Sequence, residues 1–359
     1  MSLSYLEVNH FRNLHQVVIE PDAELNIITG LNAAGKTSLL ESIFYLSYGR
    51  TFRQGQYKDL IMNDQDYFRL ISKVSHQHQK STIGIQRSSK EQLIRVNQRT
   101  ITRLSDLSSL LPVIALHPDS HQLLSAGPEN RRHFMDWGVF HVEHSFLQIW
   151  KNYRKALSQR NAALRCHHND RLCNLWNHAL IENAELIDRF RNDYLNKLNE
   201  RLSFFSERIF PDCKINLEYK KGWPEDISYQ MHLEKHLSKD REKGFTQCGP
   251  HRSDIKIKLD NKSAQTSISR GQQKKLVALL RLAQLDLFVE HTGRRCILLY
   301  DDLPAELDAN NRRILMEILS GMQVQLFITA IETSQLDYSG YQSAKMFHVE
   351  HGIVSTINN

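Results

Sequence analysis

One loop of eight residues constrains the fold of this chain more than any other feature. Residues 30–37 read GLNAAGKT and fit the pattern G-x-x-x-x-G-K-[ST]. The apolar run LNIIT at 25–29 precedes the loop, and apolar residues at helical spacing follow it over 37–48. A strand, a glycine-rich loop and a helix in this order are typical of a phosphate-binding loop, or P-loop. We therefore predict an α/β fold built around a nucleotide site.

The chemistry of a P-loop assigns roles to its residues. The backbone N–H groups of such a loop cradle phosphates, and the N-terminus of the following helix adds partial positive charge. The Lys36 ammonium is expected to reach the β and γ phosphates, and the Thr37 hydroxyl to ligate Mg²⁺. ATP and Mg²⁺ are therefore the predicted cofactors. The predicted nucleotide-binding residues of the loop are Gly30, Asn32, Ala33, Ala34, Gly35, Lys36, Thr37 and Ser38.

A pair of acids follows a second apolar run. Residues 296–300 read CILLY, which is typical of a buried strand, and Asp301 and Asp302 come directly after it. In a P-loop ATPase we expect the first acid to hold Mg²⁺ through water and the second to polarise the attacking water. The predicted catalytic residues are therefore Lys36, Asp301 and Asp302, and the predicted Mg²⁺ ligands are Thr37 and Asp301.

The segment 269–273, SRGQQ, opens a predicted helix at about 272–290. A serine and a glycine at a helix N-terminus form an anion site, although a serine there is also an ordinary helix cap. The segment resembles the signature motif of ABC-type ATPases, which in that class closes on the γ-phosphate held by a second protomer. Residues 305–308 (AELD) resemble the D-loop of that class, and Thr329 stands where its switch segment would be. The predicted signature residues at the nucleotide are Ser269, Gly271 and Gln272.

A long interval without helix breakers lies between the P-loop and the signature segment. Residues 139–210 contain neither glycine nor proline, which favours long helices. Apolar residues at three- and four-residue steps predict an antiparallel helical hairpin that turns at the polar segment 166–171. We therefore predict an ABC-type P-loop ATPase head with an inserted α-helical arm. The expected parts are head residues 1–125, arm residues 126–244 and head residues 245–359.

The charge of the chain permits a nucleic-acid partner. Its 46 basic and 40 acidic side chains leave a net charge of +6. Within 131–171, eight basic residues stand against three acidic ones, and we predict a DNA-binding face there. An ordinary solvated helix face is the alternative. The eight basic residues are Arg131, Arg132, Lys151, Arg154, Lys155, Arg160, Arg165 and Arg171.

The sequence also predicts the cellular location of the protein and the redox state of its cysteines. No apolar run is long enough to span a membrane, and the N-terminus lacks the pattern of a secretory signal, so we expect a cytoplasmic protein without a membrane partner. The five cysteines are odd in number and include no C-x-x-C pair, which indicates reduced thiols. Cysteines and histidines cluster within 166–178, but their spacing is wider than in zinc sites, and we expect no zinc there.

Several motifs together resemble the RecF family of DNA replication and repair proteins, single-headed relatives of the SMC ATPases. The resemblance covers the whole chain, and the combination of GPHR with SRGQQ soon after it is quite specific. The chain departs from the family pattern at two places. The family often has an acid directly after GPHR, where this chain has Ser253, and often has two acids after the proline of HPD, where this chain has Asp119 followed by Ser120. The matching segments are 11–13 (FRN), 30–41, 49–53 (GRTFR), 117–119 (HPD), 127–132 (GPENRR), 249–252 (GPHR), 269–273 and 296–302.

The resemblance implies a function. It implies ATP-dependent homodimerisation, binding to double-stranded and to gapped or single-stranded DNA, and slow DNA-stimulated hydrolysis of ATP. It also implies recombinational repair, in which the protein helps to load RecA together with RecO and RecR. In related heads an arginine near the N-terminus contacts the nucleotide phosphates, and Arg12 is the matching position. A surface salt bridge is the alternative for Arg12.

Other classes of ATPase share part of this pattern. The ATPase subunit of a transporter would have the P-loop and the signature but not the long helical insert or GPHR. A P-loop kinase would lack the signature helix, and a full-length SMC protein would carry coiled coils of hundreds of residues. A DNA clamp of different role within the ABC and SMC class stays open. Stimulation of the ATPase by DNA separates a clamp from a kinase, which would phosphorylate a small acceptor.

Overall fold

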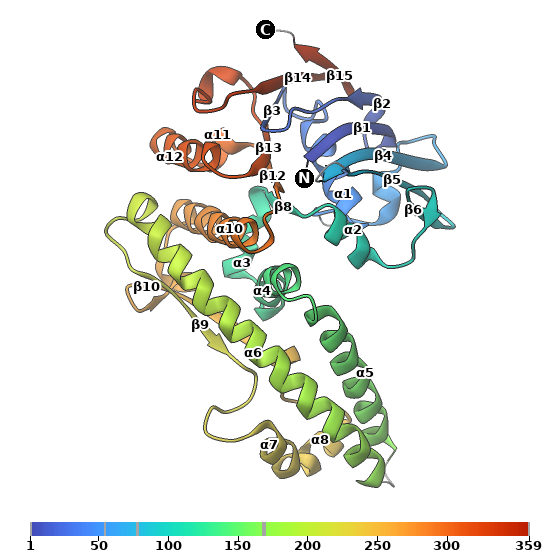
Figure 1. The fold of residues 1–359 in the computed structure, drawn as a ribbon, viewed down its shortest axis with the longest axis vertical. Coiled ribbons are helices and arrows are strands. Elements are labelled where there is room, and N and C mark those ends of the chain that lie inside the picture. The colour runs from blue at the N-terminus through green and yellow to red at the C-terminus, as the bar shows by residue number, and fades with distance from the viewer. Residues whose placement is uncertain (1, 54, 77–78, 167–169, 358–359) are drawn as a thin grey trace. The chain divides into compact units, whose positions relative to one another are not determined.

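The chain divides into two units, which we describe separately. The first comprises residues 1–120 and 293–359, and the second comprises residues 121–292. The computed structural model describes residues 2–53, 55–76, 79–166 and 170–357 (Figure 1). The P-loop and the acidic pair both belong to the first unit.

A mainly parallel sheet of six strands carries the P-loop. Its order is β15-β14-β3-β13-β12-β8, and only β15 runs antiparallel to its neighbour. Every residue of β3, β12 and β13 is buried, as expected for continuous apolar runs in a sheet covered on both faces. The strands are β3 (Leu25–Thr29), β8 (Val113–Leu116), β12 (Cys296–Tyr300), β13 (Val324–Thr329), β14 (Ala344–Glu350) and β15 (Ile353–Ile357).

The parallel sheet brings distant segments to one edge. The P-loop follows β3, the acidic pair follows β12, Thr329 ends β13, and Pro118 comes two residues after β8. Since β3, β13, β12 and β8 are parallel neighbours, their carboxyl ends share an edge, which is where ligands bind in open α/β sheets. The strands expected at 25–29 and 296–300 are confirmed as β3 and β12, whereas β14 and β15 are not among the predicted elements.

An antiparallel sheet completes the first unit. Its order is β2-β1-β4-β5-β6-β7. The strands are β1 (Ser2–Phe11), β2 (Leu14–Ile19), β4 (Tyr67–His76), β5 (Gln79–Ser88), β6 (Gln92–Val96) and β7 (Arg99–Thr100). The helices of this unit are α1 (Lys36–Tyr48), α2 (Leu104–Leu110), α11 (Leu303–Glu306) and α12 (Ala309–Ser320), with short turns η1 (Tyr57–Leu60) and η4 (Thr333–Gln335).

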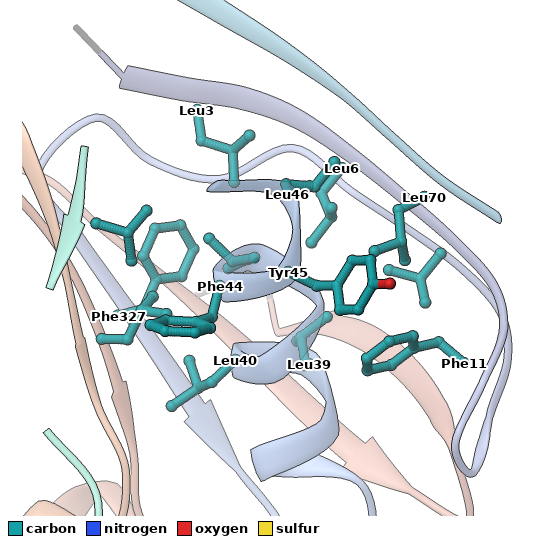
Figure 2. Packing of buried hydrophobic residues seen from close by; sticks show 14 of the residues in the cluster. Leu3, Leu6, Phe11, Leu39, Leu40, Phe44, Tyr45, Leu46, Leu70 and Phe327 are labelled. Carbon is teal, nitrogen blue, oxygen red and sulfur yellow. The ribbon is translucent and has the colours of Figure 1, made fainter. Parts of the chain in front are cut away.

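Helix α1 lies in the core between the two sheets. Figure 2 shows its apolar side chains Leu39, Leu40 and Phe44 among residues of both sheets, such as Leu6 and Phe327. Buried residues on nearly all sides make the helix a central core element rather than an amphipathic surface helix. This burial holds the P-loop, which precedes the helix, in a fixed place relative to both sheets.

The second unit is mainly helical. Its helices α5 and α6 follow each other in the chain and lie side by side in Figure 1, so the predicted antiparallel hairpin is confirmed. The apolar seam of α6 is buried at Ile187, Leu198 and Leu202, whereas the turn residues 167–169 lie outside the described ranges. The helices are α3 (Gln122–Ser125), α4 (Pro128–Val142), α5 (Phe146–Arg165), α6 (Asp170–Ile209), α7 (Tyr229–Lys235), α8 (Leu237–Lys243), α9 (Ala264–Ser267) and α10 (Arg270–Thr292).

A small antiparallel sheet, β11-β10-β9, packs with these helices. It comprises β9 (Ile215–Lys220), β10 (Asp254–Leu259) and β11 (Lys262–Ser263), and the turn η3 (Pro250–Arg252) precedes β10. Strand β9 is missing from the predicted elements. None of the helices in the described ranges is long and apolar enough to cross a bilayer.

The unit boundaries differ from the predicted division of the chain. The sequence pattern groups residues 245–292 with the head, because a strand and a helix follow each other there. In the structure, β10 pairs along its length with β9, and the buried Gln284 amide of α10 donates to the Phe134 carbonyl oxygen over 2.7 Å. These long-range partners join residues 245–292 to the helical unit. That this segment acts as part of the ATPase head remains a prediction.

Candidate nucleotide-binding site

Two glycines give the P-loop its shape. Gly30 and Gly35 have φ angles of +143° and +125°, a region that side-chain-bearing residues rarely adopt. A Cβ atom on Gly30 would lie 2.3 Å from the backbone oxygen of Val349 in β14, so the close approach of the loop to the sheet also requires glycine. The loop therefore exposes its backbone N–H groups at the start of α1, the arrangement that binds phosphate.

Lys36 lies folded over the P-loop. Its Nζ donates to the carbonyl oxygens of Gly30 and Leu31 at 2.7 and 3.0 Å. Burial lowers the pKa of Lys36, while the carboxylates of Asp302 and Asp301 act in the opposite direction. The ammonium thus stands close to two carboxylates and to the loop that would hold phosphates.

Asp301 forms the centre of a buried hydrogen-bond network. The Thr37 hydroxyl lies 3.0 and 2.9 Å from its two carboxylate oxygens, and the Thr329 hydroxyl donates to Oδ1 over 2.8 Å. Burial raises the pKa of Asp301, against the effect of both hydroxyls. A hydroxyl beside a buried carboxylate is a ligand set that suits Mg²⁺, whose charge would stabilise the carboxylate. These residues therefore fit the predicted cation.

Asp302 leaves the strand in an unusual conformation. Its φ angle is +53°, in the left-handed region, and its backbone N–H donates to the Thr329 hydroxyl over 2.7 Å. The half-buried carboxylate lies at the same cavity as Lys36 and Asp301. Thr329 thus contacts both acids and fixes their relative placement.

These side chains surround a cavity of about 480 Å³, called the P-loop cavity below. Nine of the predicted nucleotide-site residues line it, whereas Gly30 and Ala34 do not. Gly30 instead accepts from Lys36, and the backbone N–H of Ala34 donates to the Leu31 oxygen over 3.3 Å. The cavity is lined by Arg12, Asn13, Asn32, Ala33, Gly35, Lys36, Thr37, Ser38, Arg53, Pro118, Asp301, Asp302 and Thr329.

Three lining residues were not among the predicted site residues although they lie in quoted motifs. Asn13 bridges the loop and the helix, because its Nδ2 donates to the Ala33 oxygen over 3.2 Å and its Oδ1 accepts from the Ser38 hydroxyl over 2.7 Å. Arg53 and Pro118 also line the cavity. The signal that could have found them is their place in three of the motifs that carry the family resemblance, 11–13, 49–53 and 117–119.

The ion pair considered as the alternative for Arg12 is present, and contact of Arg12 with the nucleotide phosphates stays a prediction. Its guanidinium pairs with the carboxylate of Glu41 in α1, and its side chain also lines the P-loop cavity. Arg12 has a left-handed φ angle of 54°, and its backbone N–H donates to the Leu60 oxygen over 2.8 Å. The ion pair therefore does not remove Arg12 from the cavity.

The signature segment lies in the second unit, whereas all lining residues of the P-loop cavity belong to the first. Ser269 and Gln272 form a reciprocal cap: the Ser269 N–H donates to the Gln272 side chain over 3.0 Å, and the Gln272 N–H donates to the Ser269 hydroxyl over 3.3 Å. Ser269, Gly271 and Gln272 are all exposed. The helix cap that the sequence left as an alternative is thus present, and the role of these residues at a nucleotide stays a prediction.

The predicted DNA-binding face needs correction at two positions. Arg160 is fully buried and its guanidinium bonds to Asp240 over 2.8 Å, and Arg131 pairs with Asp254 over 2.7 Å. Arg160 lies on the face of α5 that also buries Tyr153 and Leu157, which a count of charges cannot show. Lys151, Arg154, Lys155 and Arg165 are exposed, Arg132 is half-buried, and the side chain of Arg171 lies outside the described part of the chain.

Comparisons with known proteins agree along the whole chain. The family described as RecF/RecN/SMC N terminal domain matches residues 2–355. A protein of Thioalkalivibrio sulfidiphilus named DNA replication and repair protein RecF is 40% identical and covers 98% of both chains. A protein of the same name from Shewanella loihica is 38% identical, and the match covers 99% of this chain and all of the relative.

Solved structures show the same fold. The recombination mediator protein RecF with ATP, described as part of the RecFOR pathway, is 28% identical with a TM-score of 0.88, and the match covers 99% of this chain and 98% of that one. An Smc head bound to the C-winged helix domain of ScpA is 13% identical with a TM-score of 0.60, over 99% of this chain and 97% of the other. This second likeness concerns the fold alone.

The fold and the P-loop geometry define the class, which is an ABC-type ATPase head with a helical arm, as in SMC proteins. The parallel sheet, the P-loop, the acidic pair and the inserted hairpin are all present. Within this class, the chain belongs to the RecF family of DNA replication and repair proteins. A transporter subunit and a small-molecule kinase, which the sequence had left as alternatives, lie outside this family.

Proposed function

We propose that this protein is a Mg²⁺-dependent ATPase that pairs with a second copy in the presence of ATP, grips DNA and acts in recombinational repair. The observation that carries the proposal is the meeting of Lys36, Thr37, Asp301 and Asp302 at one cavity at the sheet edge. The names of the related structures, RecF with ATP in the RecFOR pathway, support ATP as the ligand and RecO and RecR as partners. Assistance in loading RecA onto gapped DNA is part of the proposal, as is a cytoplasmic location.

The residues at the cavity suggest how ATP would be bound and hydrolysed. The P-loop N–H groups and Lys36 would hold the β and γ phosphates in place of the two carbonyl oxygens that Lys36 now contacts. Thr37 and Asp301 would hold Mg²⁺, which neutralises charge on the phosphate oxygens. Asp302 would orient water for attack and accept its proton. The Thr329 hydroxyl, which accepts from the Asp302 backbone N–H and donates to the Asp301 carboxylate, would hold these two acids in place.

Hydrolysis with and without DNA tests this function. We expect ATP hydrolysis that needs Mg²⁺ and that rises when duplex or gapped DNA is added. Sedimentation with and without ATP and Mg²⁺ should show a nucleotide-dependent dimer. A protein that neither binds nor hydrolyses ATP would contradict the proposal at its first step.

Pairing through the signature segment is supported by the surroundings of Gly271. Apart from its two chain neighbours and the nearby backbone of its own helix, no atom of the described residues lies within 4 Å of the place where its Cβ would stand, so packing against other parts of the chain does not require glycine there. Exposed Ser269 and Gln272 flank this open position. We infer that the segment closes on the γ-phosphate held by a second copy.

Ser269→Arg is expected to leave ATP binding intact and to prevent ATP-induced pairing. The long cation would fill the space that the partner's γ-phosphate needs. Sedimentation in ATP and Mg²⁺ measures the dimer, and a filter or fluorescence assay measures nucleotide binding. Thr266→Arg, an equal change at an exposed residue of α9, serves as the control and should dimerise normally. A Ser269→Arg protein that dimerises like its parent would refute the signature assignment.

The DNA-binding surface that we propose lies around the GPHR segment. Exposed Arg252 and Arg154 and half-buried Arg132 all disfavour the protonated form of His251, so these three cations are close to one histidine. Burial is the main cause that lowers the pKa of His251 to about 4. Because His251 is then neutral, the positive charge around it comes from the three arginines. Lys155, which follows Arg154 in α5, adds a further exposed cation.

Neutralising these cations should weaken DNA binding and reduce its dependence on salt. For Arg154→Gln, Lys155→Gln and Arg252→Gln together, each lost phosphate contact should lower the slope of log K against log salt by about 0.9 on duplex DNA. Titrations at several salt concentrations measure the slope. A triple variant with the same charge change at exposed Lys90, Arg99 and Arg103 of the first unit is the control. If the slope does not change, the DNA site lies on another surface.

A further inference from the structure

Glu41 is a buried carboxylate that no predicted role accounts for. It lies in α1, five residues after Lys36, and its side chain is 0% exposed. Its neighbours along the helix, Leu39, Leu40 and Ile43, belong to the apolar core. A charge in such a place is costly unless it is paired and hydrogen-bonded, so its partners must offset a large desolvation penalty.

The partners of Glu41 come from two other segments of the first unit. Arg12, in the turn after β1, forms an ion pair through Nε and donates from Nη2 to Oε1 over 3.0 Å. Thr51, in the loop after α1, donates its hydroxyl to the same Oε1. Arg53 in this loop places Nη1 3.9 Å from Oε2. One carboxylate thus connects the turn, the helix and the loop.

Both arginines bound by this carboxylate line the P-loop cavity, whereas Glu41 does not. Glu41 takes the side of the Arg12 guanidinium formed by Nε and Nη2. Among the described residues, none forms a hydrogen bond with the remaining nitrogen, Nη1. The guanidinium is planar and rigid, so a carboxylate that holds one side also sets the direction of the other.

The position of Arg12 indicates which part of a ligand it would meet. Arg12, Asn13 and Ala33 also border a second cavity of about 750 Å³. Arg12 therefore stands between the phosphate-binding loop and a space large enough for further parts of a nucleotide. A cation held at this border is suited to a phosphate oxygen rather than to the carbonyl oxygens of the loop.

We propose that Glu41 is a positioning residue of the nucleotide site, which fixes Arg12 so that its free edge donates to a phosphate oxygen of ATP. Glu41 itself touches no ligand, and it acts through Arg12, with Thr51 and Arg53 holding the loop in register. The inference rests on the proposed binding of ATP at the P-loop. It predicts that Glu41 and Arg12 contribute to ATP affinity as a single unit.

A double-mutant cycle tests the coupling. Arg12→Gln and Glu41→Gln are each expected to raise the Kd for Mg²⁺-ATP about tenfold, because each removes the same oriented charge-assisted hydrogen bond. The double variant should also lose about tenfold rather than about a hundredfold, since coupled residues are not additive. Fluorescence titration with labelled ATP measures Kd, and thermal unfolding is followed for every variant. Glu91→Gln, in an exposed turn, is the control for carboxylate removal.

The outcomes separate this inference from the proposed function. A Glu41→Gln protein that binds ATP like its parent, or a double variant with additive losses, overturns the positioning role. If Glu41→Gln does not fold, Thr51→Val removes one donor while keeping the charge. Thr51→Val should then raise Kd about threefold, and an unchanged Kd would overturn the role in that case. Lys36→Ala is measured alongside: a parent that binds no ATP, or a Lys36→Ala protein that still binds it, refutes the proposed function instead.

Discussion

Replacing Lys36 by alanine is expected to reduce ATP affinity at least a hundredfold, about 2.8 kcal/mol of binding free energy, and to abolish hydrolysis. Lys36 is the cation at the centre of the P-loop, where its ammonium contacts the oxygens of Gly30 and Leu31. When phosphates enter, these contacts can be exchanged for charged oxygens, which bind an ammonium more strongly than neutral carbonyls do. Alanine leaves the loop intact but without its charge.

Lys36→Ala should fold normally, because the contacts it loses lie within one loop. Equilibrium titration with ATP and a phosphate-release assay measure binding and hydrolysis, and thermal unfolding checks the fold. Lys90→Ala removes the same charge from an exposed turn of the same unit and should behave like the parent. Unchanged ATP binding by Lys36→Ala would show that the P-loop cavity is not the nucleotide site.

Asp302→Asn is expected to slow ATP hydrolysis by about 10² to 10⁴ while ATP still binds. The amide keeps the shape of the side chain but cannot accept a proton from water. Asparagine also tolerates the left-handed backbone that Asp302 adopts, at φ +53°, so the turn after β12 should be preserved. Asp301, Thr37 and Lys36 remain in place to bind the nucleotide.

The same change should trap the ATP-bound dimer. If two copies enclose ATP, then blocking hydrolysis prevents release, and DNA held by the pair should dissociate more slowly. The dimer fraction and the DNA off-rate in ATP are compared for the variant and its parent. Asp301→Asn provides the contrast, because it weakens the predicted Mg²⁺ ligand and should reduce pairing. An Asp302→Asn protein that stays monomeric in ATP while its parent dimerises would refute the water-activating role, and a parent that never dimerises would refute the mechanism.

The elements around the P-loop could be predicted because their signals are local. A buried parallel strand is a continuous apolar run, as in 25–29 and 296–300, and a P-loop needs glycine at defined places. The Gly- and Pro-free interval likewise predicted the α5–α6 hairpin. For the same reason nine residues predicted for the nucleotide site do line one cavity.

Long-range partners decided what the local pattern could not. The strand β10 follows the strand-and-helix pattern of the head, but its hydrogen bonds to β9 place it in the helical unit. Arg160 counted as one more cation of a basic segment, but the register of α5 turns it inward to Asp240. In both cases the partner lies far away in the chain, where a local pattern carries no information.

The identity of the nucleotide-binding loop and of its acidic partners is therefore encoded in short motifs, because each residue performs its chemistry through its own backbone or its own strand end. The residues that hold these site residues in position cannot be recognised from a local motif. Glu41 is the one acidic residue of helix α1, and its role becomes visible only when folding brings Arg12 and Thr51 to its carboxylate. Burial makes such a charge depend on neighbours from other segments, and only the folded chain provides them.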